Sequence, residues 1–128
     1  MTLLLDTCVF IWLTQEPGRL STAAQAAIDD PANALIFSHV SAWEMHLKHK
    51  AGKLLLPESP RNWIPQQLAA WRIAELAIHL NAIQRTSDLP PIHRDPFDRM
   101  LVAQVLETGF AIISTDDLFP AYGVPVVW

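Results

Sequence analysis

Cysteine is almost absent from the sequence, and Cys8 is its only example. A single cysteine excludes an internal disulfide and any zinc site built from several cysteines, which fits a reducing compartment. Because Cys8 lies between an apolar run and a helical segment, we interpret it as a small buried residue rather than a reactive thiol. The chemistry of the chain is therefore expected from other side chains.

Long apolar runs and an excess of positive charge are missing as well. The longest apolar runs, TLLL and GVPVVW, are too short to span a bilayer, and no basic segment precedes an apolar one as in a secretory signal. We therefore expect a soluble, cytoplasmic protein with no membrane association. With 13 acids against 9 lysines and arginines, the net charge of −4 gives no global field that attracts nucleic acid. Any contact with nucleic acid would be local and helped by a cation.

The composition points to one packed unit. At 128 residues the chain can bury a core without crosslinks, and we expect a single domain over residues 1–128. Hydrophobic residues make up 51% of the chain, and its mean hydropathy is +0.20. This is more apolar than a solvated monomer requires, which favours a second copy or another protein covering part of the surface.

Apolar runs of strand length alternate with segments of helical period, a pattern typical of a parallel sheet with helices on its faces. We therefore predict an α/β fold with a mainly parallel central sheet. Helix starts and stops are read from capping residues, Pro and Gly. The pattern predicts strands at 2–5, 34–37, 110–113 and 124–128, and helices at 7–14, within 20–30, and at 40–51, 61–70, 78–85 and 96–108.

The middle of the chain is less regular, because prolines at 57, 60, 65, 90 and 91 divide it. We expect a brief extended piece at 53–56 and a loop leading to residue 94. No internal repeat, linker or low-complexity segment is present.

Acidic residues stand where predicted strands end. Asp6 directly follows the first strand, and Asp116 comes shortly after the strand at 110–113. In open parallel α/β sheets the ligand crevice lies outside the carboxyl ends of the strands. Glu44 lies in the first turns of the helix that follows the strand at 34–37. A parallel sheet would therefore bring Asp6, Glu44 and Asp116 to one edge.

The stretch RDPFDRM holds two further acids with different expected roles. Asp95 followed by Pro96 is typical of a helix start, with Asp95 as the N-cap. At about 100° per residue, Asp98 falls on the same helical side as Leu101 and Val102 and should point toward the sheet. An unpaired carboxylate there costs several kcal/mol unless a cation or hydrogen-bond donors meet it. Glu44 is expected to face the core in the same way, on a stripe with Val40, Leu47 and Ala51.

Several carboxylates within a few ångströms repel one another by about 4 kcal/mol per pair at an effective dielectric constant of about 20. Such a cluster requires a divalent cation, raised pKa values, or both. Oxygen ligands without cysteines or an organised set of histidines favour Mg²⁺ or Mn²⁺ over zinc. The chemistry that follows is phosphodiester hydrolysis, with one ion activating water and one stabilising the leaving oxygen.

Four stretches that span the chain also resemble a known family: LLLDTCVFIWL, SHVSAWEMHLKHKAGKLLLP, HRDPFDRMLVAQ and IISTDDLFPAYGVPVVW. They are similar to the PIN-domain ribonucleases, in particular to toxins of the VapBC type. The last two stretches are specific when taken together, whereas an isolated LLLDT would be a weak signal. By this resemblance the four acids of the family fall on Asp6, Glu44, Asp98 and Asp116, the set reached above from the predicted strands and helices.

The resemblance implies a three-layer α/β/α sandwich and an Mg²⁺-dependent endoribonuclease that cleaves RNA. It also implies a homodimer, and a toxin inhibited by a small antitoxin protein. The four acids would then be both catalytic residues and metal ligands. Because no side chain is an obvious nucleophile, we expect metal-activated water to attack the phosphodiester.

Further polar residues are secondary candidates near this site. Thr7 and Ser114 could orient a carboxylate or water, although capping and strand-end hydrogen bonds are their default roles. Asp95 could contact a metal-bound water, whereas Asp117 is expected to cap the following helical turn, which leaves Asp116 as the ligand. Basic residues beside the helix start could hold RNA phosphates, namely His93, Arg94 and Arg99.

Other residues have a plainer interpretation. Lys48, Lys50 and Lys53 are expected on a solvated helix face, as are His46 and His49, while His39 is expected near the cleft. The five tryptophans are expected to fill the core or a subunit interface.

Two other functions remain open at this point. A haloacid-dehalogenase-like phosphatase also places an Asp after its first strand and uses Mg²⁺, but it needs a second Asp two residues later, where Cys8 stands. A non-catalytic PIN-like protein would use the acids only to bind a structural metal.

Overall fold

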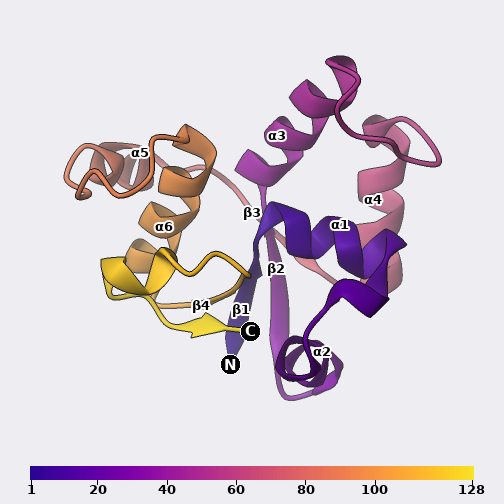
Figure 1. The fold of residues 1–128 in the computed structure, drawn as a ribbon, viewed down its shortest axis with the longest axis horizontal. Helices are drawn as coiled ribbons and strands as arrows, with labels where there is room; N and C mark the ends of the chain where they lie inside the picture. The colour runs from indigo at the N-terminus through magenta and orange to yellow at the C-terminus, as the bar shows by residue number, and fades with distance from the viewer.

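The computed structural model describes all 128 residues and contains a five-stranded sheet in the order β3-β2-β1-β4-β5 (Figure 1). All four strand pairings are parallel. The strands are β1 (Thr2–Leu5), β2 (Ala34–Ser38), β3 (Ala74–Leu76), β4 (Ala111–Ile113) and β5 (Val126–Val127). The helices are α1 (Thr7–Gln15), α2 (Thr22–Asp29), α3 (His39–Lys50), α4 (Pro60–Trp71), α5 (Leu80–Thr86) and α6 (Pro96–Thr108), with 3₁₀ turns η1 (Pro17–Arg19) and η2 (Phe119–Tyr122).

Alternate side chains of each inner strand enter two separate cores. In β1, Leu3 and Leu5 belong to a core of 15 buried residues, whereas Leu4 belongs to a core of 8 on the opposite face. In β4, Ile113 lies on the side of the larger core and Ile112 on the side of the smaller one. Strands buried on both faces need apolar side chains in both directions, which explains their continuous apolar runs.

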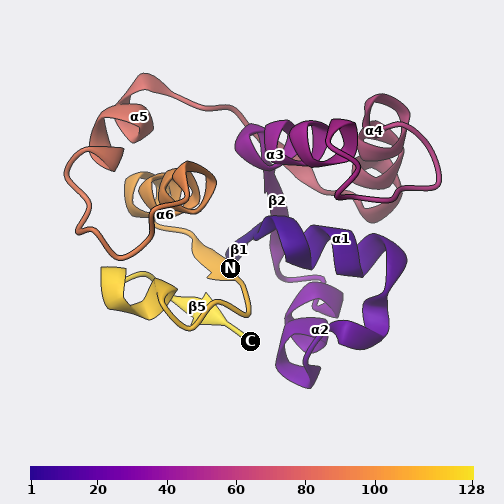
Figure 2. The same ribbon diagram turned by 45° about the horizontal axis from the view of Figure 1, so that its top comes forward.

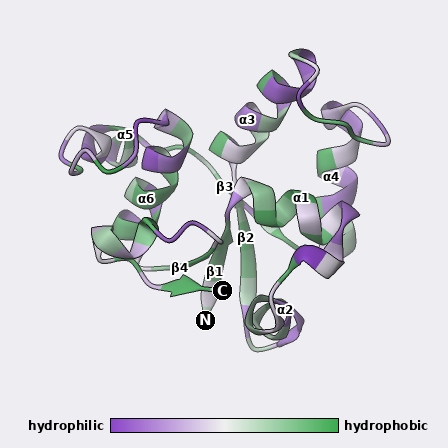
Figure 3. Ribbon diagram, in the orientation of Figure 1, coloured by the Kyte–Doolittle hydropathy of each residue, from purple (hydrophilic) through white to green (hydrophobic).

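Helices cover both faces of the sheet and make three layers. Figures 1 and 2 show α1, α2 and α4 on one side of the strands and α5 and α6 on the other. Helix α3 contributes Met45 to the larger core and Val40 to the smaller core, so it joins the two halves. In Figure 3, β1, β2 and β5 are predominantly hydrophobic, whereas the helices carry both colours, as expected for elements with one solvated side. The predicted α/β/α sandwich with a parallel sheet is therefore confirmed.

The chain order of the strands creates a crevice at the centre of the sheet. From β1 the chain proceeds to β2 and β3 on one side, and it then returns to β4 and β5 on the other. Ligands of such sheets bind outside the carboxyl ends of the strands at this point of reversal. Leu5 of β1 pairs with Ile113 of β4, so the next residues, Asp6 and Ser114, emerge side by side there.

The middle of the chain holds the strand that the sequence pattern missed. Strand β3 was not predicted, because it is a three-residue edge strand whose first two residues are exposed and show no alternation. Its pairing with β2 is decided by tertiary contacts rather than by local sequence. Residues 53–56, predicted as a brief extended piece, lie between α3 and α4 and belong to no helix or strand.

Several predicted orientations of side chains were also wrong. Leu47 is 46% exposed, and Ala51 is exposed, so the buried side of α3 runs through Val40, Glu44 and Met45 instead. Gln104 of α6 is buried, and it accepts a hydrogen bond from Ser38 Oγ at 2.5 Å. A buried amide is tolerated because its polar atoms are paired.

The tryptophans do not fill the core. None of the five is buried; three of them, Trp43, Trp71 and Trp128, are 58%, 38% and 39% exposed. Trp43 packs edge-on against Phe97, with ring centroids 5.3 Å apart. Phe10, Phe37 and Phe119 are the aromatic residues at the centre of the structure.

None of the six helices has both the length and the apolar character needed to cross a bilayer.

The central position of β1 leads to a stability prediction. Leu4 is fully buried between two covering layers, so Leu4→Ala should lower the free energy of unfolding by about 2–5 kcal/mol. The same change at Leu55, which is 86% exposed, should have an effect of at most about 0.5 kcal/mol. Urea denaturation of the two variants measures both values, and equal losses would contradict the described core.

Candidate metal centre

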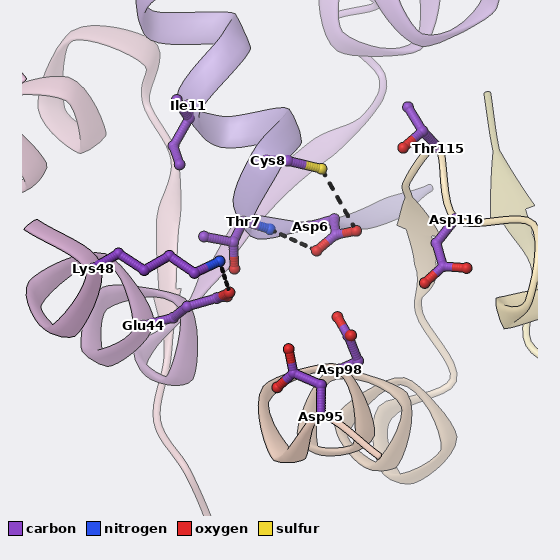
Figure 4. A pocket seen from close by; sticks show the side chains of 10 residues that line it. All are labelled: Asp6, Thr7, Cys8, Ile11, Glu44, Lys48, Asp95, Asp98, Thr115 and Asp116. Atoms are coloured by element: carbon purple, nitrogen blue, oxygen red, sulfur yellow. Dashed lines mark hydrogen bonds and ion pairs between the residues drawn. The ribbon is translucent and has the colours of Figure 1, made fainter. Parts of the chain in front are cut away.

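A pocket of about 390 Å³ opens at the carboxyl edge of the sheet, where β1 and β4 end (Figure 4). Five carboxylates and one ammonium group line it, and they come from four separate segments of the chain. The lining residues are Asp6, Thr7, Cys8, Ile11, Glu44, Lys48, Asp95, Asp98, Thr115 and Asp116.

Asp6 is the most firmly held carboxylate of the pocket. It is 7% exposed, and it caps α1 by accepting a hydrogen bond from the Thr7 backbone N–H at 2.7 Å. Its other oxygen accepts a bond from Ser114 Oγ at 2.6 Å. Burial raises the pKa of Asp6, these two hydrogen bonds oppose the rise, and the charges of Glu44 and Asp116 add to it. Ser114 at the end of β4 thus donates a hydrogen bond to a pocket carboxylate.

The Thr7 side chain bonds to a neighbouring helix rather than to a carboxylate of the pocket. Its hydroxyl donates to Ser41 Oγ on α3 at 2.8 Å, and both residues are buried. This bond joins the start of α1 to α3, and so it fixes the spacing between Asp6 and Glu44. Sequence reasoning did not find Ser41, which lies on α3 three positions before Glu44.

Glu44 reaches the pocket from α3 and is 6% exposed. Its Oε2 accepts a hydrogen bond from Lys48 Nζ at 2.6 Å, one helical turn later. Burial lowers the pKa of Lys48, but the hydrogen bond and charge of Glu44 outweigh this effect and raise it. Lys48 therefore lines the pocket as its one cationic side chain, and with 49% of its side chain exposed it is also solvated, as the sequence predicted.

The two acids of RDPFDRM separate in the structure. Asp95 is exposed and caps α6, because its Oδ1 accepts a bond from the Phe97 backbone N–H at 2.8 Å. Asp98 is half-buried, and no protein group donates a hydrogen bond to its carboxylate (Figure 4). Burial, followed by the charges of Asp95 and Asp6, raises the pKa of Asp98 to about 7. Among the five pocket carboxylates, that of Asp98 is thus the one that receives no hydrogen bond from the protein.

Asp116 follows β4 and is held by two hydrogen bonds ahead of η2. Its Oδ1 accepts a bond from the Leu118 backbone N–H at 2.9 Å, and its own N–H donates to Ser114 Oγ at 3.0 Å. Asp117 is exposed and does not line the pocket. The prediction that Asp117 caps the helical turn was wrong, because no side chain caps η2.

The predicted phosphate-binding residues have other partners. His93 is enclosed and contacts Asp116 Oδ2 through Nε2 at 2.6 Å and the Tyr122 hydroxyl through Nδ1 at 2.7 Å. Arg99 donates to four backbone carbonyls of the preceding loop, those of Thr86, Leu89, Pro90 and His93. Neither side chain is free to hold a phosphate. Arg94 is exposed and makes no ion pair.

Cys8 and His39 have surroundings other than those expected from the sequence, and no sequence pattern indicated a role for Tyr122. Cys8 is half-buried and lines the pocket, where burial and then Asp6 raise the pKa of its thiol to about 12, so it remains protonated. His39 bonds to Glu75 at 3.0 Å instead of to a pocket acid. Tyr122 lies 29 residues from His93, and no local pattern predicts their contact.

The donor set of the pocket fits a divalent cation. Side-chain ligand atoms of His93, Asp98 and Asp116 lie within 4.8 Å of one another, with Asp6 and Glu44 on the same pocket. Five carboxylates face one ammonium group, and the least compensated of them holds its proton near neutral pH. Hard oxygen donors with this excess of negative charge suit Mg²⁺ or Mn²⁺.

The raised pKa of Asp98 predicts how stability depends on pH in the absence of divalent ions. Between about pH 4 and pH 7 the folded chain retains a proton that the unfolded chain has lost, so the free energy of unfolding falls as the pH rises. Asp98→Asn should weaken this fall and be more stable than the wild type above pH 7. Thermal melts across this range in EDTA test the prediction, with Asp117→Asn as the control. An unchanged slope in Asp98→Asn would contradict it.

Comparison with other proteins places the chain in a family. Residues 3–124 match the family described as the PIN domain. The chain is 29% identical over 117 residues to Ribonuclease VapC22 of Mycobacterium tuberculosis (strain ATCC 25618 / H37Rv), with 90% of this chain and 87% of that protein covered.

Solved structures agree on the fold. Rickettsia felis VapBC2, bound to a DNA fragment from its promoter, has a chain that matches with a TM-score of 0.70 at 8% identity, covering 98% of this chain and 97% of that one. FitAcB from Neisseria gonorrhoeae matches with a TM-score of 0.56 at 20% identity, covering 97% and 95%. The match over residues 3–124 shows that the chain belongs to the PIN domain family.

Proposed function

We propose that this protein is a metal-dependent endoribonuclease that hydrolyses RNA phosphodiesters. The observation that carries the proposal is the convergence of Asp6, Glu44, Asp98 and Asp116 on one pocket that contains a single cationic side chain. These four residues are proposed as both the catalytic residues and the ligands of Mg²⁺, with Mn²⁺ as a substitute. When bound, the divalent ion supplies activation of water and stabilisation of the leaving oxygen.

The protein's own groups prepare this site in distinct ways. Ser114 and the Thr7 N–H fix the two oxygens of Asp6, and His93 and the Leu118 N–H fix those of Asp116. Rigid carboxylates bind a cation better, because less freedom is lost when it arrives.

No side chain of the pocket is prepared to act as a nucleophile. Cys8 keeps its proton because its thiol pKa is raised to about 12, and Ser114 already donates its hydroxyl hydrogen to Asp6. The pocket therefore suits hydrolysis by water rather than a covalent intermediate. Lys48 and the exposed Arg94 supply local positive charge for RNA phosphates on a chain whose net charge is −4.

The relatives support a biological setting. VapC22 is named a ribonuclease, and the structural neighbours include the VapBC2 complex and FitAB bound to a DNA fragment. We accordingly propose that this chain is the toxin of a toxin–antitoxin pair, inhibited by a small antitoxin protein in the cytoplasm. Exposed apolar residues such as Trp43 and Leu80, at 58% and 67% exposure, favour coverage by that partner or by a second copy in a homodimer.

The two rival functions receive less support. A haloacid-dehalogenase-like phosphatase requires an acid at the position of Cys8, whose thiol remains protonated. A non-catalytic protein that binds a structural metal would need no pocket of about 390 Å³ open to solvent beside its carboxylates.

RNA cleavage tests the proposal. The wild type, purified free of any inhibitor, should cleave RNA with Mg²⁺ or Mn²⁺ and stop when EDTA is added. Asp6→Asn and Asp98→Asn each remove a carboxylate charge and should lower the rate by at least about 100-fold, since loss even of outer partners costs 10–100-fold.

Asp95 offers a matched control within the same helix start. Asp95→Ser replaces one N-cap by another of similar strength and should retain most of the activity. Equal losses in Asp95→Ser and Asp98→Asn would contradict the division of RDPFDRM into a cap and a ligand. Cleavage unaffected by Asp6→Asn or by EDTA would overturn the proposed function.

A further inference from the structure

We propose that His93, held by Tyr122, is a positioning residue that fixes the Asp116 carboxylate for the binding of a divalent cation. The inference rests on the proposed function, because it concerns how one of the four carboxylates of that site is oriented. It assigns a role to Tyr122, which the proposed reaction does not otherwise use, and it extends the role of His93 in fixing Asp116.

His93 contacts Asp116 directly. His93 Nε2 lies 2.6 Å from Asp116 Oδ2, and the two side chains are 7% and 27% exposed. The other oxygen, Oδ1, accepts a bond from the Leu118 backbone N–H at 2.9 Å. With a donor on each oxygen, the Asp116 carboxylate cannot rotate without losing a hydrogen bond, and its remaining lone pairs stay directed at the pocket.

The Tyr122 hydroxyl determines which nitrogen of His93 carries the proton. It lies 2.9 Å from the His93 backbone nitrogen, whose N–H it accepts, and 2.7 Å from Nδ1. Its own hydrogen is therefore available to donate to Nδ1. In the neutral ring this leaves the proton on Nε2, where it is donated to Asp116. A proton on Nδ1 would instead set a bare Nε2 lone pair against the carboxylate.

Packing holds this pair of rings in place. The Tyr122 ring stacks on His93 with centroids 5.5 Å apart and planes 10° apart. The ring of fully buried Phe119 also lies near His93, with centroids 5.1 Å apart. Tyr122 closes η2, and the chain turns at Gly123 in the left-handed conformation that glycine favours. The imidazole is thus oriented before any cation arrives.

His93 also connects two segments that contribute separate acids. Arg99, the residue after Asp98 on α6, donates to the His93 carbonyl at 3.3 Å and to three other carbonyls of the loop before α6. The side chain of His93 then crosses to Asp116 in the loop after β4. The relative placement of Asp98 and Asp116 therefore depends on His93 as well as on the sheet.

The same geometry distinguishes positioning from direct ligation. Ligand atoms of His93, Asp98 and Asp116 lie within 4.8 Å of one another, so His93 is close enough to bind a cation itself. To do so, Nε2 would have to lose its proton and release Asp116, while Nδ1 took a proton toward Tyr122. The proposed tautomer, with the proton on Nε2, instead keeps both contacts of the ring, and His93 then acts through Asp116.

The experiment measures Mn²⁺ affinity by calorimetry without RNA, alongside RNA cleavage. His93→Ala should weaken Mn²⁺ binding about 10- to 100-fold, the range expected for a residue that orients a ligand. His93→Gln places an amide N–H donor near the position of Nε2 and should recover most of this loss. Tyr122→Phe should give an intermediate loss. In the metal-free wild type, long-range ¹H–¹⁵N NMR should place the proton of the neutral ring on Nε2.

Val124→Ala is the control for a purely structural effect. Val124 is 6% exposed in the same small core and does not line the pocket, so its loss should reduce stability while Mn²⁺ affinity stays near the wild-type value. Equal weakening of Mn²⁺ binding in Val124→Ala would overturn the positioning role. So would a failure of His93→Gln to improve on His93→Ala.

Two further outcomes separate this inference from the proposed function. Pulsed electron paramagnetic resonance of bound Mn²⁺ should show no directly coordinated nitrogen, and a nitrogen coupling from His93 would make it a ligand and overturn the inference alone. Wild-type affinity and cleavage in His93→Ala would do the same. If the wild type neither binds Mn²⁺ nor cleaves RNA, the proposed function and the inference fail together.

Discussion

Repulsion among carboxylates at the carboxyl edge of the sheet is the constraint around which this structure is arranged. Five acids line one pocket, and Lys48 is the only cationic side chain that faces them. Unit charges about 4 Å apart repel by about 4 kcal/mol at an effective dielectric constant of about 20, which is large against a total stability of about 5–15 kcal/mol. Burial, followed by this repulsion, raises the pKa of Asp98 to about 7. A divalent cation removes it, which is why we connect the pocket with metal-dependent hydrolysis.

The rest of the fold brings these charges together in spite of their repulsion. The register of β1 with β4 sets Asp6 beside Ser114, and the apolar cores on both faces hold that register. Polar contacts then hold the surrounding elements: Thr7 to Ser41 between α1 and α3, and Ser38 to Gln104 between β2 and α6. Each of these contacts joins segments far apart in the sequence. The stability of the hydrophobic cores thus maintains a site that is unfavourable in isolation.

Local sequence was sufficient for the parts of the fold that depend on local physics. The apolar runs of β1, β2 and β4, and the helix start at Asp95 and Pro96, were predicted because burial on both faces and helix capping leave clear patterns. The four acids could also be placed near one another, because strand ends and helical periodicity determine an edge. Strand β3 could not be found, since its pairing with β2 is a tertiary contact. The network of His93, Tyr122 and Asp116 had no local signal, because it joins residues 23 and 29 positions apart.

In the proposed function, the carboxylates of this pocket bind a divalent cation directly. Crystals grown near neutral pH with Mn²⁺ test this binding through the anomalous scattering of the metal. We expect a peak in the pocket within about 2.0–2.6 Å of carboxylate oxygens of Asp98 and Asp116, with Asp6 and Glu44 facing the same ion or its bound water. An empty pocket at millimolar Mn²⁺, or a peak bound only by residues outside it, would rule out direct binding by these carboxylates.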